Sequence, residues 1–203
     1  MKTQDGRLYV ISGASRSGKT AWTRKATARA KRIFSWDPEA QWCDVAGFHK
    51  ITTRKMLLAY MAKPGPQKIA YVAGGDLKAE FDFFCGCAMY AGRYVEGLEV
   101  IAEELADVST PSKAPGNWGI LVRRGLKRGI TIRAISQRWS EADKTAVGNA
   151  TDFVFFRMSS GDDVRYLSRK TKIEEIEINA LVPLQYVHMD ALNGNISRGK
   201  LKF

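Results

Sequence analysis

The sequence predicts an α/β fold in which helices cover both faces of a mostly parallel sheet. Short runs of β-branched and aromatic residues alternate with helix-prone segments along the chain, as in folds whose parallel strands are joined by helices. One run, DFVFFRM at 152–158, is almost continuously apolar, which is typical of a strand covered on both faces. The chain has 203 residues, 45% of them hydrophobic, and this composition suits a single buried core.

Apolar runs and breakers delimit the elements of the first half. Segments rich in Ala, Lys and Arg, or with a 3.6-residue apolar period, predict helices, while β-branched and aromatic runs predict strands. Pro38 ends the second strand, because a residue before proline avoids the helical region, and KPGPQ at 63–67 is a breaker. Asp76 could cap the third helix. In order, we expect a strand at 8–11, a helix to about 32, a strand at 33–36, a helix at 52–61, a strand at 69–73 and a helix at 76–95.

The second half continues this alternation and closes with a hairpin. Gly129 ends a basic helix, and the dipeptide Asn193-Gly194 is typical of a tight turn between two strands. In order, we expect a strand at 98–105, a polar loop at 109–117, a helix at 118–127, a strand at 130–136, a helix at 141–150, a strand at 152–158 and a helix at 161–172. The chain is thus expected to form a domain at 1–182 and a C-terminal β-hairpin extension at 183–203 that packs on it.

A phosphate-binding motif joins the first strand to the first helix. The pattern G-x-x-x-x-G-K-T, the Walker A motif, runs from Gly13 to Thr20. Its glycines let backbone N–H groups wrap a polyphosphate, Lys19 can reach the β- and γ-phosphates, and the Thr20 hydroxyl can bind Mg²⁺. We therefore predict a P-loop NTPase that binds ATP and Mg²⁺. The residues expected at the nucleotide are Gly13, Ala14, Ser15, Arg16, Ser17, Gly18, Lys19, Thr20 and Ala21.

Two adjacent carboxylates, Glu103 and Glu104, end the strand predicted at 98–105. An NTPase needs one acid at the end of a strand beside the phosphate loop to hold Mg²⁺ through water, and a second acid often polarises the attacking water. We assign the first role to Glu103, although aspartate is more usual there, and the second to Glu104. Asp76 is the alternative metal acid, less favoured because two glycines separate it from the preceding strand. The pair could also be surface acids at the start of a helix.

A polar amide, Gln137, follows the strand predicted at 130–136. At the tip of a strand next to the paired carboxylates, an amide can hydrogen-bond the γ-phosphate or the attacking water. Gln137 is therefore the candidate sensor of the bound nucleotide.

The charge of the chain favours a polyanionic partner. Lys and Arg number 32 against 21 Asp and Glu, a formal net charge of +11, and basic residues cluster at 16–32 and 113–138. Three cysteines and two distant histidines give little support to a metal site built from protein ligands alone. The sequence contains no run of about eighteen apolar residues, so we expect no membrane span.

Taken in order, the Walker A motif, the glutamate pair, the strand that ends in Gln137-Arg138 and the DFVFFR strand resemble the FtsK/HerA superfamily of DNA-translocating ATPases. The small size and the closing hairpin are similar to the genome-packaging ATPases of tailless icosahedral viruses with internal membranes. The resemblance covers about 7–203 and includes Trp36-Asp37-Pro38. It implies a RecA-like (ASCE) P-loop fold, with the Mg²⁺ acid at Glu103, the catalytic glutamate at Glu104 and the sensor at Gln137.

The resemblance also implies an arginine finger that reaches the site of a neighbouring subunit from the segment before the sensor strand. The aligned position is Leu126, so Arg124 or Arg128 would have to substitute, with Arg123 a weaker candidate. The implied function is ATP-driven packaging of double-stranded DNA into a preformed viral capsid. The implied assembly is a ring, a hexamer or pentamer, that binds DNA without reading its sequence. Its implied partners are capsid or portal-vertex proteins. Its implied location is the host cytoplasm and the packaging vertex of the virion.

Three other functions remain open from the sequence. A filamentous-phage assembly ATPase similar to zonular occludens toxin would export single-stranded DNA, but such proteins commonly carry a membrane span. A small-molecule P-loop kinase would need a lid with phosphate-binding arginines, and the Gln-tipped strand argues against it. The third possibility is a DNA-binding or structural subunit that hydrolyses ATP poorly, because position 103 carries glutamate where aspartate is more usual.

Overall fold

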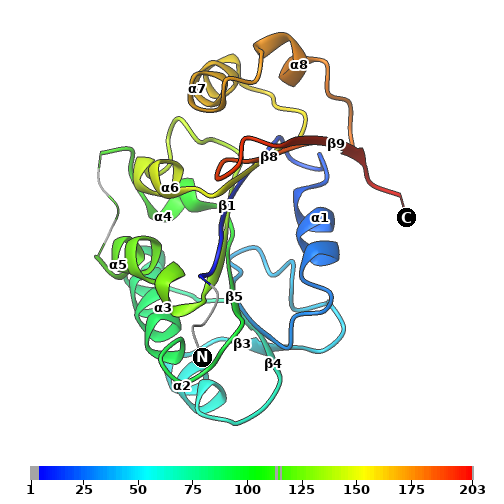
Figure 1. The fold of residues 1–203 in the computed structure, drawn as a ribbon. Helices are drawn as coiled ribbons and strands as arrows, with labels where there is room; N and C mark the ends of the chain where they lie inside the picture. Colours follow the sequence, from blue (N-terminus) through cyan, green and yellow to red (C-terminus); the bar gives the residue numbers. More distant parts are fainter. Residues whose placement is uncertain (1–4, 113, 115, 203) are drawn as a thin grey trace.

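A nine-stranded sheet forms the centre of the computed structural model, which describes residues 5–112, 114 and 116–202 (Figure 1). The parallel strands are, in spatial order, β3 (Phe48–Ile51), β4 (Gln67–Tyr71), β2 (Arg32–Trp36), β5 (Leu98–Ala102), β6 (Thr131–Ser136), β1 (Leu8–Ser12) and β7 (Asp152–Phe155). An antiparallel hairpin, β8 (Gln185–Asp190) and β9 (Ile196–Lys200), continues the sheet beside β7. The predicted mostly parallel sheet with a C-terminal hairpin is confirmed.

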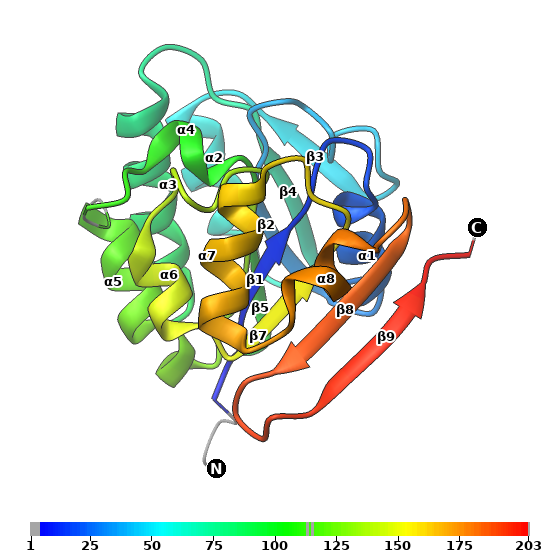
Figure 2. The ribbon, with the colours of Figure 1, turned by 90° about the horizontal axis from the view of Figure 1, so that it is seen from above.

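Helices cover both faces of this sheet, as predicted (Figure 1). The helix α1 (Lys19–Ala26) packs on one face. The opposite face carries α2 (Arg54–Met61), α3 (Leu77–Ala91), α4 (Leu105–Val108), α5 (Gly116–Arg124) with the 3₁₀ turn η1 (Leu126–Arg128), and α6 (Lys144–Asn149). At the top of Figure 1, and in front in Figure 2, lie α7 (Gly161–Thr171) and α8 (Glu175–Asn179).

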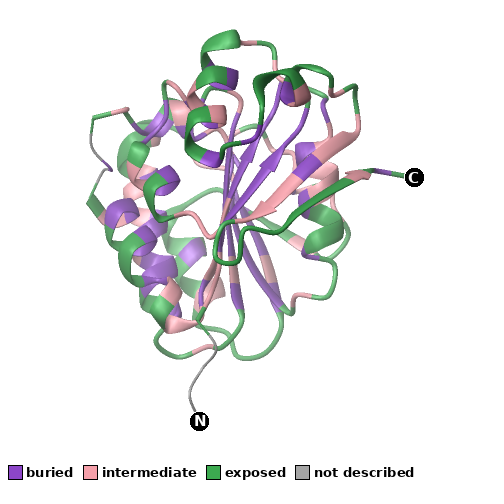
Figure 3. Ribbon diagram, turned by 45° about the horizontal axis from the view of Figure 1, so that its top comes forward, coloured by how far each residue is buried: buried purple, intermediate pink, exposed green. Residues whose placement is uncertain are grey.

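Two buried apolar clusters, one on each face, hold the layers together. The larger cluster joins strand residues such as Trp36 to aromatic residues of α3 and to Trp118 of α5. The smaller one lies on the face of α1 and includes Trp42, Phe156 and Leu201. Figure 3 shows the central strands as almost wholly buried, whereas the hairpin is partly exposed. Alternate side chains of the parallel strands therefore point into two separate cores.

The structure corrects the bounds of several predicted elements. The first helix ends at Ala26 and not near residue 32, because Arg32 already pairs in the sheet with neighbours on both sides. The strand β5 ends at Ala102, since Glu104 adopts a φ of 46°, which a strand cannot contain. Neither β3 nor α8 was predicted. Within the described part of the chain, none of the helices combines the length and the apolar character needed to cross a bilayer.

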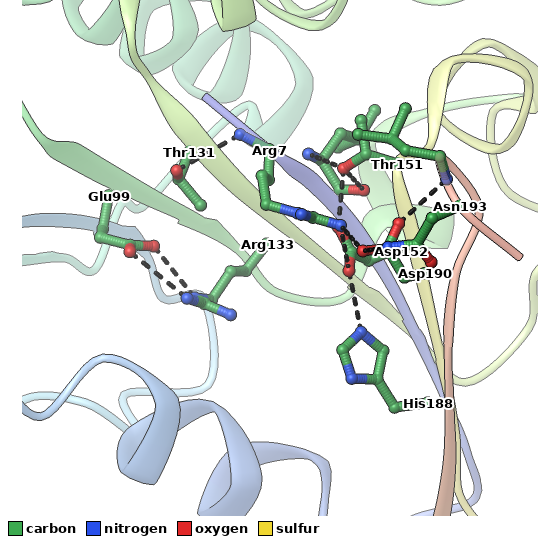
Figure 4. A network of polar contacts seen from close by, with 11 residues as sticks. Arg7, Glu99, Thr131, Arg133, Thr151, Asp152, His188, Asp190 and Asn193 are labelled. Atoms are coloured by element: carbon green, nitrogen blue, oxygen red, sulfur yellow. Dashed lines mark hydrogen bonds and ion pairs between the residues drawn. The ribbon is translucent and has the colours of Figure 1, made fainter. Parts of the chain in front are cut away.

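A polar network fastens the hairpin to the sheet (Figure 4). The buried Asp152 accepts hydrogen bonds from Arg7 Nε at 2.7 Å and Thr151 Oγ1 at 2.7 Å, and its Oδ1 lies 2.8 Å from His188 Nε2. Arg7 Nη2 also lies 2.8 Å from Asp190 Oδ2. Burial raises the pKa of Asp152, but hydrogen bonds from His188, Arg7 and Thr151 outweigh it, so the pKa is lowered. The Asp152 carboxylate on β7 thus connects Arg7, the residue before β1, to His188 on β8.

Candidate functional site

The Walker A loop connects β1 to α1 and packs tightly against the end of β7. A Cβ at Gly13 would lie 2.6 Å from Ser17 Oγ and 2.7 Å from Phe156 Cβ. At Gly18, where φ is 121°, a Cβ would lie 3.0 Å from Phe156 Cε1. The Ala14 N–H donates to the Arg157 carbonyl at 2.8 Å. Only glycine fits these two positions, because the loop backbone packs directly against Phe156.

Lys19 is held inside this loop. Its side chain is buried, and its Nζ donates to the carbonyls of Gly13 at 2.8 Å and Ala14 at 3.0 Å. Burial lowers the pKa of Lys19, while the nearby charges of Glu104 and Glu103 act in the opposite direction. The ammonium of Lys19 can therefore leave these two carbonyls and donate to a bound anion instead.

Glu103 and Glu104 follow β5 directly and differ in environment. Glu103 is 2% exposed, and burial raises its pKa to about 7 even though Trp42 Nε1 donates to its Oε1 at 2.9 Å. Glu104 is less buried and adopts a left-handed φ of 46°, an uncommon conformation for a residue other than glycine. Its Oε1 accepts from Gln137 Nε2 at 2.8 Å. Residues with an uncommon backbone conformation of this kind cluster at active sites.

These groups line one cleft of about 600 Å³ at the carboxyl ends of β1, β5 and β6. In open α/β sheets, ligands bind in a crevice at this edge, outside the carboxyl ends of the strands. The predicted residues that line it are Ser15, Arg16, Gly18, Lys19, Thr20, Ala21, Glu103, Glu104 and Gln137. Gly13, Ala14 and Ser17 belong to the loop but do not line the cleft. Sequence reasoning missed three lining residues, Arg24, Gln41 and Leu184.

Asp76, the alternative metal acid, lies elsewhere. Its Oδ1 accepts from the backbone N–H groups of Lys78 at 3.0 Å and Ala79 at 3.2 Å, so it caps α3. It does not line the cleft. A second and larger cavity, of about 1100 Å³, lies between α2 and α3 and has mainly apolar walls, but it contains none of the motif residues. The smaller cleft is therefore the candidate site.

The candidate finger arginines are not part of this cleft. Arg124 is exposed at the end of α5, and Arg128 Nη1 donates to the Met89 carbonyl of α3 at 3.1 Å. Both precede β6, whereas Gln137 follows it, so they lie toward the opposite edge of the sheet. Leu126 packs against the larger core. Neither arginine can serve the cleft of its own chain without a large movement.

The residues present fit a nucleoside triphosphate and Mg²⁺. The glycine-walled loop, Lys19 and the start of α1 offer positive charge and N–H donors to a polyphosphate. The buried Ser17 Oγ has no hydrogen-bond partner among the described residues. Thr20 and Glu103 offer the oxygen ligands that Mg²⁺ prefers. The arrangement can therefore bind a metal–nucleotide complex and place a carboxylate near it.

Two of the missed residues, Gln41 and Leu184, lie on segments that no local motif marks, whereas Arg24 lies on α1 directly after the Walker A loop. Gln41 belongs to a turn after β2, and Leu184 precedes the hairpin, where its N–H donates to the Ser17 carbonyl at 2.9 Å. Trp36-Asp37-Pro38, which belongs to the family resemblance, is adjacent to the turn that carries Gln41. That motif is the one feature of the sequence that could have drawn attention to it.

A phage protein is similar in sequence to part of this chain. No protein-family model matches the chain. It is 29% identical over 141 residues to Protein P9 of Pseudoalteromonas phage PM2, a match that covers 68% of this chain and 63% of that protein. The chain thus spans less than two thirds of the length of this relative.

Solved structures are similar over almost the whole chain. The genome packaging NTPase B204 of Sulfolobus turreted icosahedral virus 2 in complex with AMP gives a TM-score of 0.81 at 13% identity, covering 98% of both chains. B204 of Sulfolobus turreted icosahedral virus, a DNA-packaging ATPase, gives 0.76 at 14% identity over 100% of both chains. The bacterial conjugative coupling protein TrwB gives 0.70 at 12% identity, covering 98% of this chain and 86% of that one. In fold, the chain is therefore similar to viral genome packaging NTPases and to a bacterial conjugative coupling protein.

Proposed function

We propose that this chain is an ATP-driven translocase that packages double-stranded DNA into a preformed viral capsid. The observation that carries the proposal is the convergence of Lys19, the Glu103-Glu104 pair and Gln137 on one cleft beside the Walker A loop. The similar B204 proteins are named genome packaging NTPases, and two of their structures contain AMPPCP and ATP-gammaS. The fold, the motif and these relatives all support ATP as the ligand.

In this proposal each residue has a defined role. The loop N–H groups and Lys19 bind the β- and γ-phosphates, while Thr20 and, through water, Glu103 hold Mg²⁺. Mg²⁺ supplies charge neutralisation between the phosphates when bound. Glu104 accepts a proton from the attacking water, whose oxygen bonds to the γ-phosphorus as the bond to the β-phosphate oxygen breaks. Gln137, hydrogen-bonded to Glu104 at 2.8 Å, would respond to the γ-phosphate and the water together.

The proposal extends to DNA and to assembly. The net charge of +11 supports binding to phosphates without readout of bases. A ring of five or six subunits would place Arg124 or Arg128 of one subunit against the cleft of the next. The ring would act with capsid or portal-vertex proteins, in the host cytoplasm and at the packaging vertex of the virion.

ATP hydrolysis with and without double-stranded DNA tests this function. We expect Mg²⁺-dependent turnover that DNA stimulates, and we expect Lys19→Ala to lower it by about 100-fold or more, the scale for loss of one transition-state donor. Lys25→Ala, on the exposed side of α1, is the matched control and should leave turnover unchanged. Turnover that is absent in the native chain, or insensitive to Lys19→Ala, would refute the proposal. Transfer of phosphate to a small acceptor would indicate a kinase.

A further inference from the structure

One buried carboxylate organises the turn that follows β2. Asp37 is 0% exposed, and its Oδ1 accepts from the Gln41 N–H at 2.8 Å while its Oδ2 accepts from the Trp42 N–H at 2.9 Å. The thiol of Cys43 lies 3.6 Å from the same Oδ2. Both oxygens of Asp37 are thus used to fix two consecutive residues of the turn.

The first of these residues contacts the P-loop helix. Thr20 Oγ1 donates to Gln41 Oε1 at 3.0 Å. Because an amide oxygen only accepts hydrogen bonds, the hydroxyl proton of Thr20 points at Gln41 and the lone pairs of its oxygen stay available. Arg24 strengthens the attachment, since its guanidinium donates to the Gln41 carbonyl and lies 5.6 Å from the centre of the Trp42 ring.

The second residue contacts the glutamate pair. Trp42 is buried, and its Nε1 donates to Glu103 Oε1 at 2.9 Å. An indole N–H can only donate, so this bond orients the Glu103 carboxylate and leaves its other oxygen free. Gln41 and Trp42 therefore reach two groups on different elements, α1 and the end of β5, from adjacent positions in the turn.

We propose that Asp37 is a positioning residue that orients both groups expected to hold Mg²⁺, Thr20 through Gln41 and Glu103 through Trp42. The inference rests on the proposed function, in which these two side chains serve the metal. Partners that orient metal ligands in this way typically change metal affinity or activity by about 10- to 100-fold when they are removed. Asp37 fixes both partners at once, so its loss should affect both sides of the metal site.

Metal affinity of the nucleotide complex tests the proposal directly. The probes are Mn²⁺, followed by electron paramagnetic resonance, and a non-hydrolysable ATP analogue, whose binding is measured by calorimetry with Mg²⁺ and with EDTA. Asp37→Asn keeps the size of the side chain but replaces one acceptor oxygen by a donor. We expect it to leave binding of the analogue in EDTA within about twofold and to weaken Mn²⁺ binding by about 10- to 100-fold. Asp44→Asn, an exposed aspartate of the same loop, is the matched control and should change neither.

Two further variants keep the test decisive if Asp37→Asn does not fold. Trp42→Phe removes the N–H donor together with one ring of the indole, and Gln41→Met replaces the whole amide, including its acceptor oxygen, at similar length. Each should weaken Mn²⁺ binding on its own. Where Asp37→Asn folds, Trp42→Phe should weaken Mn²⁺ binding less in that background than in the native chain, because both changes act on the Glu103 carboxylate. Unchanged Mn²⁺ affinity in both variants, with metal-dependent binding intact in the native chain, would overturn the positioning role alone. Absence of metal-dependent binding in the native chain would overturn the proposed function as well.

Discussion

At the scale of single residues, burying the Glu103 carboxylate lowers the stability of the folded chain, although the proposed function needs that carboxylate. Burial raises its pKa from 4.5 to about 7, so between these values the folded chain binds more protons than the unfolded one. The free energy of unfolding therefore falls as pH rises through this window, by on the order of 3 kcal/mol, and the cost is absent below the lower value.

This cost predicts the behaviour of Glu103→Gln. The amide keeps an acceptor for Trp42 but cannot ionise, so the variant should be more stable than the native chain at pH ~8 by on the order of 3 kcal/mol, with the gain disappearing toward pH ~5. Urea unfolding in EDTA at several pH values measures the difference. Glu96→Gln, at an exposed site before β5, should stay within about 0.5 kcal/mol at every pH. An equal gain at both ends of the pH range would show that burial of charge is not its source.

At the scale of elements, local patterns predicted the parts whose residues interact with close neighbours in the chain. The third helix, expected from Asp76 and an apolar period, is α3, which Asp76 caps as expected. By contrast, β3 is an edge strand of four residues with exposed His49 and Lys50, and only its pairing with β4 makes it a strand. The end of α1 is likewise decided by sheet pairing of Arg32 and not by helix propensity.

In the candidate site too, local sequence patterns predicted some residues, while others are brought in only by tertiary contacts. The Walker A loop is a contiguous motif whose glycines are required by contacts within a few ångströms, so the sequence alone identifies it. Glu103, Glu104 and Gln137 could be named because the ends of parallel strands meet at one edge of a sheet. Gln41 and Trp42 lie in a turn that meets α1 and β5 only in three dimensions, and no spacing rule predicts such contacts.

The hairpin is the element whose attachment can be tested separately. Asp152 is buried under Arg7 and His188, so Asp152→Asn leaves Arg7 without its buried partner and should cost about 3 kcal/mol of stability. Asp190→Asn affects the more exposed member of the same network and should cost less than about 1 kcal/mol. Urea unfolding measures both, and hydrogen exchange should rise first in β8 and β9 for Asp152→Asn. Equal losses for the two variants would contradict the anchoring role of Asp152.

At the scale of the whole molecule, the net charge of +11 predicts how DNA is bound. If about six phosphates are neutralised, affinity should fall about 1000-fold between about 50 and about 200 mM salt. Fluorescence anisotropy with two duplexes of equal length and unrelated sequence measures both the salt dependence and the sequence dependence of the affinity. We expect equal affinities for the two duplexes, because phosphate contacts carry no sequence information. A tenfold preference for one duplex, or a flat salt dependence, would argue against a translocase that grips the backbone.

Assembly gives the sharpest test, because the candidate fingers lie toward the edge of the sheet opposite the cleft. Arg124 is exposed, whereas Arg128 is hydrogen-bonded to the Met89 carbonyl, so Arg124 is the better finger. Arg124→Ala should keep nucleotide binding and lose about 1000-fold in turnover, while Arg128→Ala should mainly lower stability by about 1 kcal/mol. A Lys19→Ala subunit cannot hydrolyse ATP in its own cleft, but its Arg124 is intact. Mixing it with Arg124→Ala should therefore restore turnover where the first subunit serves the cleft of the second, and if the mixture stays as inactive as its parts, the arginine does not act between subunits.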